Sequence, residues 1–338
     1  MKSKYLLIIT LIFIFSCEKE IKFNGDEIKT KIVLNGILMP DSVVKINLTE
    51  SRFFLDGESG SYSNNGSFKR IDNATVDLWK DEKIIEKLHN IGEGYYIGSY
   101  VPQIGDNIRI TASHESFDNI ECSTEIVSPT PVISADTINY REEKHYGGYY
   151  NEDGNYSIDS SSYYLAISFD MFITLKDPKN IPNYYNINLD LKYYFSNGTE
   201  ITSQVIYNSD DLVFQKGNEM NFFDDDNYLN STVFNDELFD GKEYKLKIKS
   251  NYMSGILVEN NQYNPDYETN ELVGMEISIE LQSLSYPYYM YMKTIDAKSN
   301  LYGFMEIFAE PVQIYTNIKG GIGILGSYSS SFYTIPLK

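Results

Sequence analysis

Cysteine is scarce in this sequence of 338 residues, which contains only Cys17 and Cys122. If Cys17 is modified, as argued below, no intramolecular disulfide can form. Basic residues are also few, with 28 Lys and Arg against 48 Asp and Glu, for a net charge of −20. Such a surface repels phosphate backbones, so we exclude nucleic acid as a partner.

Histidine is rare as well, and His89, His114 and His145 are scattered along the chain. The sequence has no His-Glu-x-x-His pair for zinc and no Gly-x-Ser-x-Gly turn for a nucleophilic serine. We therefore predict a protein that is not an enzyme, with no catalytic residue and no cofactor.

The N-terminus has the pattern of an export signal. Lys2 and Lys4 precede the apolar run Tyr5–Phe15, which ends at Cys17. This run is well short of the ~20 residues that cross a bilayer as a helix. We predict a signal peptide over residues 1–16, followed by a lipidated cysteine and tether over residues 17–30.

The segment that ends at Cys17 resembles the lipobox of bacterial lipoproteins, in which an aliphatic residue precedes small residues and the modified cysteine. Ile14, Ser16 and Cys17 match it. Acyl chains such as palmitate on Cys17 would hold the chain on a membrane, since each buried CH₂ contributes ~0.8 kcal/mol. Glu18 and Glu20 resemble the acidic tags that send Bacteroidota lipoproteins to the outer face of the outer membrane. A secretory signal with an incidental cysteine, and a merely solvated tether, remain the alternatives.

Period-two alternation of apolar and polar residues predicts an all-β protein. Val44, Ile46 and Leu48 share one face of such a strand, and Cys122 lies on the apolar face of another, as a buried structural thiol. Several short strands over residues 31–130 predict an immunoglobulin-like β-sandwich.

The prolines of Ser128–Pro131 interrupt this pattern, since each removes a backbone donor. We place a domain boundary there and predict a second, larger β-sandwich-like domain over residues 131–338. Its strands are longer, Tyr140–Ser162 is expected to be irregular, and Pro287–Asn300 is predicted to be its one short helix.

An acidic segment suggests hard oxygen ligands for calcium. Asp224, Asp225 and Asp226 form its centre, with Asp236 and Asp240 downstream. It lacks the ligand spacing and central glycine of an EF-hand loop, so a solvated acidic loop is the other interpretation.

A glycine-rich segment formally matches the dinucleotide fingerprint at Gly321, Gly323 and Gly326. The context excludes that function, because no acidic residue follows where the fingerprint requires one. The glycines instead favour a tight bend or a close backbone approach, and we predict that they also contribute to docking a partner.

Several short motifs together resemble the family catalogued as domain of unknown function 4249, DUF4249. They are Ile32–Gly36, Asp177-Pro178, Asn183–Tyr185, Phe234–Lys242, Ala309–Val312, Asn317-Ile318 and Gly320–Gly326. The resemblance covers nearly the whole chain after Cys17. It implies a Bacteroidota outer-membrane lipoprotein, often encoded beside a TonB-dependent transporter, and it implies no catalytic residue.

These observations lead to one functional expectation and one alternative. We expect a surface or periplasm-facing outer-membrane lipoprotein that acts as a non-catalytic accessory subunit, binding or capping, of a TonB-dependent nutrient transporter. The alternative is a stand-alone surface adhesin or glycan-binding module, in which tyrosines and the acidic segment contact polysaccharide.

Overall fold

The computed structural model describes residues 29–52, 69–150, 156–214, 232–250, 254–259, 271–299 and 313–337. Within that part, Lys31–Ser51 and the residues after Ser63 belong to one compact unit. Strands make up most of the described residues and helices only a small part, which confirms the all-β prediction. No helix among them is long and apolar enough to cross a membrane.

The elements follow one another along the chain with a single α-helix near the end of the described part. They are β1 (Ile32–Leu38), β2 (Lys45–Glu50), β3 (Thr75–Lys80), β4 (Lys83–Lys87), β5 (His89–Gly92), β6 (Tyr95–Ile97), β7 (Asn107–Ser113), β8 (Ile120–Glu125), β9 (Val132–Tyr150), β10 (Tyr156–Lys176), β11 (Tyr184–Phe195), β12 (Glu200–Gln204), the 3-10 turn η2 (Leu212–Phe214), β13 (Val233–Asn235), β14 (Glu243–Lys249), β15 (Ser254–Glu259), β16 (Leu272–Leu284), α2 (Tyr286–Ser299) and β17 (Ile322–Pro336). Helix α2 thus begins one residue before the predicted start at Pro287.

The strands form three sheets. The largest has the order β12-β11-β16-β17-β1-β2-β6-β5, with β13 also paired to β11. A second sheet has the order β14-β10-β15, with β9 on the other side of β10, and a third has the order β4-β3-β7-β8.

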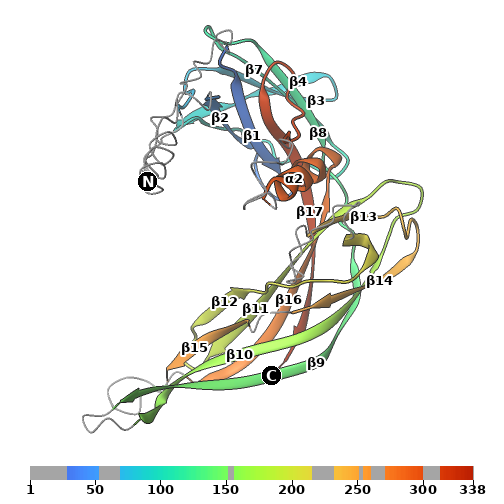
Figure 1. The fold of residues 1–338 in the computed structure, drawn as a ribbon. Coiled ribbons are helices and arrows are strands. Elements are labelled where there is room, and N and C mark those ends of the chain that lie inside the picture. The colour runs from blue at the N-terminus through green and yellow to red at the C-terminus, as the bar shows by residue number, and fades with distance from the viewer. Residues whose placement is uncertain are drawn as a thin grey trace, which may run out of the picture. The chain divides into compact units, whose positions relative to one another are not determined.

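Strand β17 joins the two halves of the largest sheet. Its first residues pair in parallel with β1, where Val33 lies opposite Ile322. Its later residues pair antiparallel with β16, where Leu284 lies opposite Tyr328. Strand β17 is therefore the neighbour of β1 in one half of this sheet and the neighbour of β16 in the other half (Figure 1).

Two separate cores lie between the sheets, because each strand buries alternate residues. One core packs β1 and β2 against β3, β7 and β8 through residues such as Leu34, Leu78 and Ile110, all fully buried. The other packs β11 and β16 against β10 and β14 through residues such as Leu189 and Ile173. The predicted domain boundary near residue 130 lies just before β9, and the division into two domains stays a prediction.

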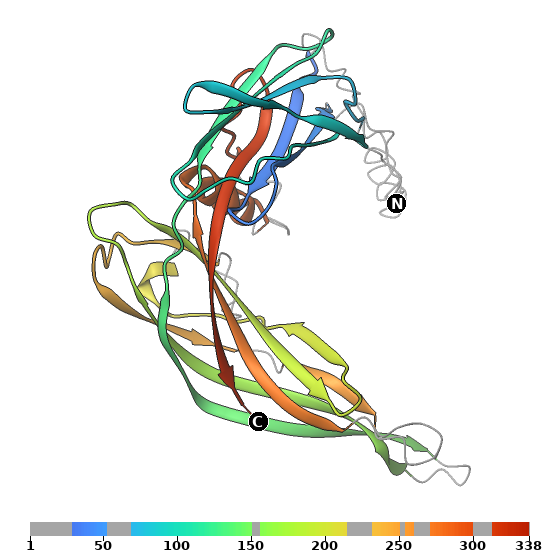
Figure 2. The ribbon, with the colours of Figure 1, turned by 180° about the vertical axis from the view of Figure 1, so that it is seen from behind.

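The expectation of an irregular segment over Tyr140–Ser162 is wrong. Strands β9 and β10 extend through most of it as a long hairpin, in which Lys144 pairs with Leu165 (Figure 2). Many side chains in this part of β9 are exposed, so the sequence shows no apolar alternation there. Backbone pairing and the ring contact between Tyr146 and Tyr163, with centroids 5.7 Å apart, hold the hairpin instead.

Candidate functional site

Two predicted sites lie outside the described residues. Cys17, the predicted lipidation site, precedes residue 29, where the described part begins. The calcium candidates Asp224, Asp225 and Asp226 fall within residues 215–231, which are not described. Both assignments stay predictions.

The three glycines of the rejected dinucleotide fingerprint make close backbone contacts within the chain. A Cβ at Gly323 would stand 2.0 Å from the carbonyl oxygen of Leu34, and one at Gly321 would stand 2.6 Å from that of Ile32. A Cβ at Gly326 would lie 2.6 Å from the Cβ of Tyr288 in α2. The close approach expected from the sequence is confirmed, whereas partner docking at these glycines stays a prediction.

The predicted buried thiol is confirmed, because Cys122 is a free cysteine with only 3% of its surface exposed. The histidines lie on different elements. His89 begins β5, His114 packs on Phe117 after β7, and His145 lies beside Glu143 in β9.

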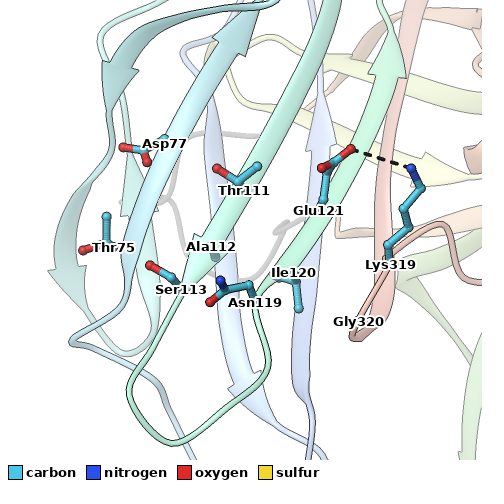
Figure 3. A pocket seen from close by; sticks show the side chains of 10 residues that line it. All are labelled: Thr75, Asp77, Thr111, Ala112, Ser113, Asn119, Ile120, Glu121, Lys319 and Gly320. Atoms are coloured by element: carbon cyan, nitrogen blue, oxygen red, sulfur yellow. Dashed lines mark ion pairs between the residues drawn. The ribbon is translucent and has the colours of Figure 1, made fainter.

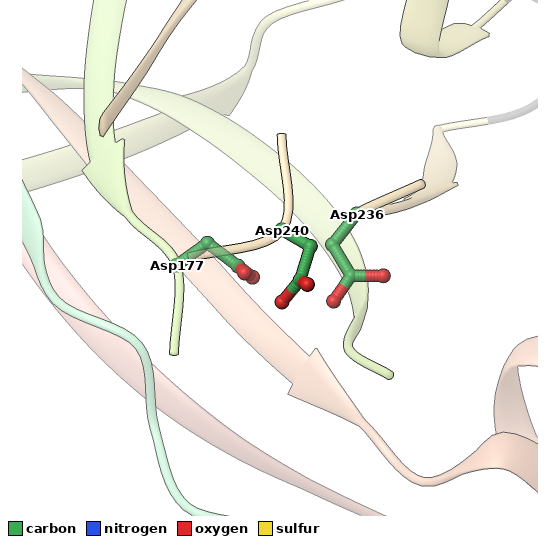
Figure 4. Close-up of side chains that lie close together, drawn as sticks. All are labelled: Asp177, Asp236 and Asp240. Carbon is green, nitrogen blue, oxygen red and sulfur yellow. The ribbon is translucent and has the colours of Figure 1, made fainter. Parts of the chain in front are cut away.

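A cluster of three aspartates lies where two loops meet, and we call residues 177–183 and 236–242 the aspartate loops. One carboxylate oxygen each from Asp177, Asp236 and Asp240 lies within 4.8 Å of the others (Figure 4). Among the described residues, this is the only group of three or more acidic, His or Cys side chains close enough to share a metal ion.

Each aspartate also ties one loop to the other. Asp177 accepts a hydrogen bond from the Gly241 backbone N–H at 2.8 Å, and Asp240 accepts one from the Asn180 N–H at 2.8 Å. Asp236 accepts from the Asn183 backbone N–H at 2.8 Å. These charge-assisted bonds make the cluster a rigid junction between the loops.

Burial dominates the electrostatics of Asp177, which is only 3% exposed. Burial raises the pKa of Asp177, and the negative charges of Asp236 and Asp240 raise it further against hydrogen bonds from Tyr185 and Gly241. The Tyr185 hydroxyl donates to Asp177 Oδ1 at 2.5 Å. Burial first, and then this hydrogen bond, raise the pKa of Tyr185, so its hydroxyl remains a donor at neutral pH.

Buried aromatic rings pack next to the aspartate cluster, and the two aspartate loops carry exposed apolar side chains. Tyr185 and Phe234 have ring centroids 5.3 Å apart, and both are buried. In contrast, Ile181 and Leu238, one on each aspartate loop, are 59% and 56% exposed. Rigid loops with exposed apolar side chains and an acidic interior suit contact with a partner, and the oxygens that remain would suit a hard cation.

The sequence identified part of this site. It placed Asp236 and Asp240 among the acidic residues that could bind calcium, whereas Asp177 stood only in a motif of the family resemblance and was not among these candidates. Asp177 follows β10 and lies far away along the chain, and the pairing of β11 with β13 and of β10 with β14 brings its loop to the other. No local pattern signals that contact.

Comparison with known proteins identifies a family. The model of a family described as domain of unknown function, DUF4249, matches residues 18–334. No curated protein matches the chain.

Proposed function

The chain belongs to the DUF4249 family. We propose that it is a Bacteroidota outer-membrane lipoprotein that serves as a non-catalytic accessory subunit of a TonB-dependent nutrient transporter. It would face the cell surface or the periplasm and bind or cap the transporter's cargo. The family description assigns no activity, so the chain's own features have to support the proposal.

The observation that carries the proposal is the lipobox-like segment ending at Cys17, followed by a chain that is mostly strand in its described part. Two or three acyl chains on Cys17 would anchor the protein stably, because one chain alone gives only marginal binding. Residues 18–30 would form the tether. At ~3.5 Å per residue it reaches at most ~45 Å, so the partner would lie near the membrane.

We assign the partner contact to the aspartate loops. Exposed Ile181 and Leu238 offer apolar anchors, and the hydrogen bonds of Asp177 and Asp240 hold both loops in place before binding. A preorganised contact loses less entropy on association than a flexible one. Glu237, next to Leu238, would favour a partner with basic residues around an apolar pocket.

Affinity purification of the tagged full chain from gently solubilised outer membranes tests the partnership. A TonB-dependent barrel should co-purify with the parent chain and be lost with Leu238→Asp. The matched control is Ile91→Asp in β5, because Ile91 and Leu238 are both 56% exposed. If no barrel co-purifies, and deletion of the protein leaves uptake intact but abolishes adhesion, the stand-alone adhesin replaces this proposal.

The anchor is tested separately by Cys17→Ala. The variant should appear as unprocessed or soluble protein, whereas the parent fractionates with the outer membrane. Unchanged membrane fractionation of the variant would rule out lipid anchoring at Cys17.

A further inference from the structure

A groove lies on the outer face of the β4-β3-β7-β8 sheet, opposite the side that packs on the core, and polar residues line it together with Ala112, Ile120 and Gly320. Its volume is about 480 Å³, and its walls come from β3, β7, β8 and the segment before β17 (Figure 3). The intervening residues of these strands, such as Val76, Ile110 and Cys122, point into the core and are buried. The alternation of the strands thus gathers polar side chains on this face.

The strand register arranges the groove in cross-strand rows. In the central row, Asp77 lies opposite Thr111, Thr111 opposite Glu121, and Glu121 opposite Lys319. In the next row, Thr75 lies opposite Ser113. Neighbouring rows are two residues apart along the strands, or roughly 7 Å, and neighbouring strands are roughly 5 Å apart.

The wall formed by Lys319 is fixed by backbone contacts. Lys319 and Glu121 exchange two backbone hydrogen bonds, of 2.8 and 3.1 Å. The following residue, Gly320, has a φ of +77°, and a Cβ there would lie 2.3 Å from the carbonyl oxygen of Asn119. Glycine therefore lets this segment close against β8 and complete the groove.

Most polar groups in the groove are available to a ligand. Within the described part of the chain, the side chains of Thr75, Asp77, Ser113 and Asn119 have no hydrogen-bond or ion-pair partner. Thr111 Oγ1 accepts a hydrogen bond from Trp79 Nε1 at 3.0 Å, which leaves the Thr111 hydroxyl hydrogen to donate. The groove thus offers donors and acceptors side by side.

The charged side chains around the groove leave only a small negative excess. Glu121 lies 3.7 Å from Lys319 on one side and 3.7 Å from Arg109 on the other. Of these charged residues, Asp77, Glu121 and Lys319 line the groove, and Arg109 also lies 3.5 Å from Glu82, so the charged groups here sum to a net charge of −1, in a chain whose net charge is −20. A negative excess disfavours an anion, and a site built for a cation would carry a larger one.

We propose that this groove binds a neutral saccharide. Each sugar hydroxyl both donates and accepts, as do the Thr75, Thr111 and Ser113 hydroxyls, while the Asp77 carboxylate accepts and the Asn119 amide does both. A small number of placed polar groups is what orients a ligand in a site of this volume. The site is independent of the transporter partnership and lies on elements other than the aspartate loops.

The fluorescence of Trp79 reports on this groove directly. It is the only tryptophan in the sequence, and its indole N–H is bonded to the groove residue Thr111. The purified full chain is titrated with maltohexaose, cellohexaose, xylohexaose and mannohexaose, and with hexagalacturonate as an acidic comparison. Excitation at the red edge avoids the 30 tyrosines. At least one neutral oligosaccharide should change the emission saturably, and the acidic one should bind more weakly.

Two variants locate the binding site. Asp77→Asn should weaken the affinity for that oligosaccharide by about tenfold or more, since hydrogen bonds to a charged group are the strong ones. Asp136→Asn, which makes the same change at an exposed position of β9, should bind like the parent. Thr75→Ala provides a second groove variant if Asp77→Asn does not fold.

Three results would overturn the proposal. They are no emission change with any neutral oligosaccharide, tighter binding of hexagalacturonate, and a parent-like affinity in a folded groove variant. Because none of these assays involves a membrane partner, their failure is distinguishable from failure of the transporter proposal.

Discussion

Two tyrosines of β11 allow a test in which the same substitution should have opposite effects. Tyr185 and Tyr193 are both 0% exposed. The Tyr185 hydroxyl donates to Asp177 Oδ1 at 2.5 Å, whereas the Tyr193 hydroxyl has no hydrogen-bond partner among the described residues. Replacing each by phenylalanine removes one oxygen and leaves the ring.

Tyr185→Phe should lower the free energy of unfolding by about 1.5–3 kcal/mol, because Asp177 stays buried and loses its strongest donor. Tyr193→Phe should be neutral or stabilising by up to about 1 kcal/mol, because it removes an unsatisfied buried hydroxyl. Urea denaturation followed by circular dichroism measures both changes.

The effect of Tyr185→Phe should also depend on pH. The pKa of Asp177 is raised by burial and by its acidic neighbours, so Asp177 contributes stability below its ordinary pKa and loses it as the pH rises through the raised value. Removing the Tyr185 hydrogen bond raises this pKa further, so the destabilisation should grow from acid to neutral pH. Equal losses in the Tyr185 and Tyr193 variants, or a loss that does not change with pH, would refute the reasoning.

Three further predictions concern other parts of the chain. Gly323→Ala should lower the free energy of unfolding by more than about 2 kcal/mol, because its φ is +112° and a Cβ would stand 2.0 Å from the Leu34 oxygen; a parent-like thermal midpoint would contradict this. Burial raises the pKa of Cys122 to about 12, so its thiol should not react rapidly with an alkylating reagent. In the Cys17→Ala variant, where Cys122 is the only cysteine, mass spectrometry should therefore find no rapid alkylation of the folded protein. For Asp106, burial opposes ionisation, but hydrogen bonds hold its pKa below the ordinary value. Its contribution to stability is present above the ordinary pKa and is lost as the pH falls through the lowered one, so Asp106→Asn should flatten the acid side of the urea-midpoint profile.

The strands with one buried face were predictable from the sequence, because burial imposes period two on their residues. Leu246 and Ile248 illustrate this in β14, where both are buried and the lysines beside them are not. The helix near Pro287 could also be predicted from the sequence. Much of the β9–β10 hairpin was not, since a strand that exposes many of its side chains leaves no apolar pattern.

The candidate sites were harder to predict from the sequence than the strands. Asp177 and the Asp77-to-Lys319 row depend on which strands are neighbours, and period two does not encode that order. The resemblance to DUF4249 predicted the family, and the family match confirms it. It supplied no residue role, so both sites emerged only from the strand register.

The pairing of β17 with β1 has a consequence for how the protein folds. Val33 and Ile322 are partners although nearly the whole described chain lies between them. Closing so long a loop is slow, and until it closes β1 is paired only to β2 and presents its other edge. A growing chain would thus keep its first sandwich incomplete until β17 is added. During that interval the open edge of β1 is where intermolecular strand pairing, and hence aggregation or chaperone binding, should begin.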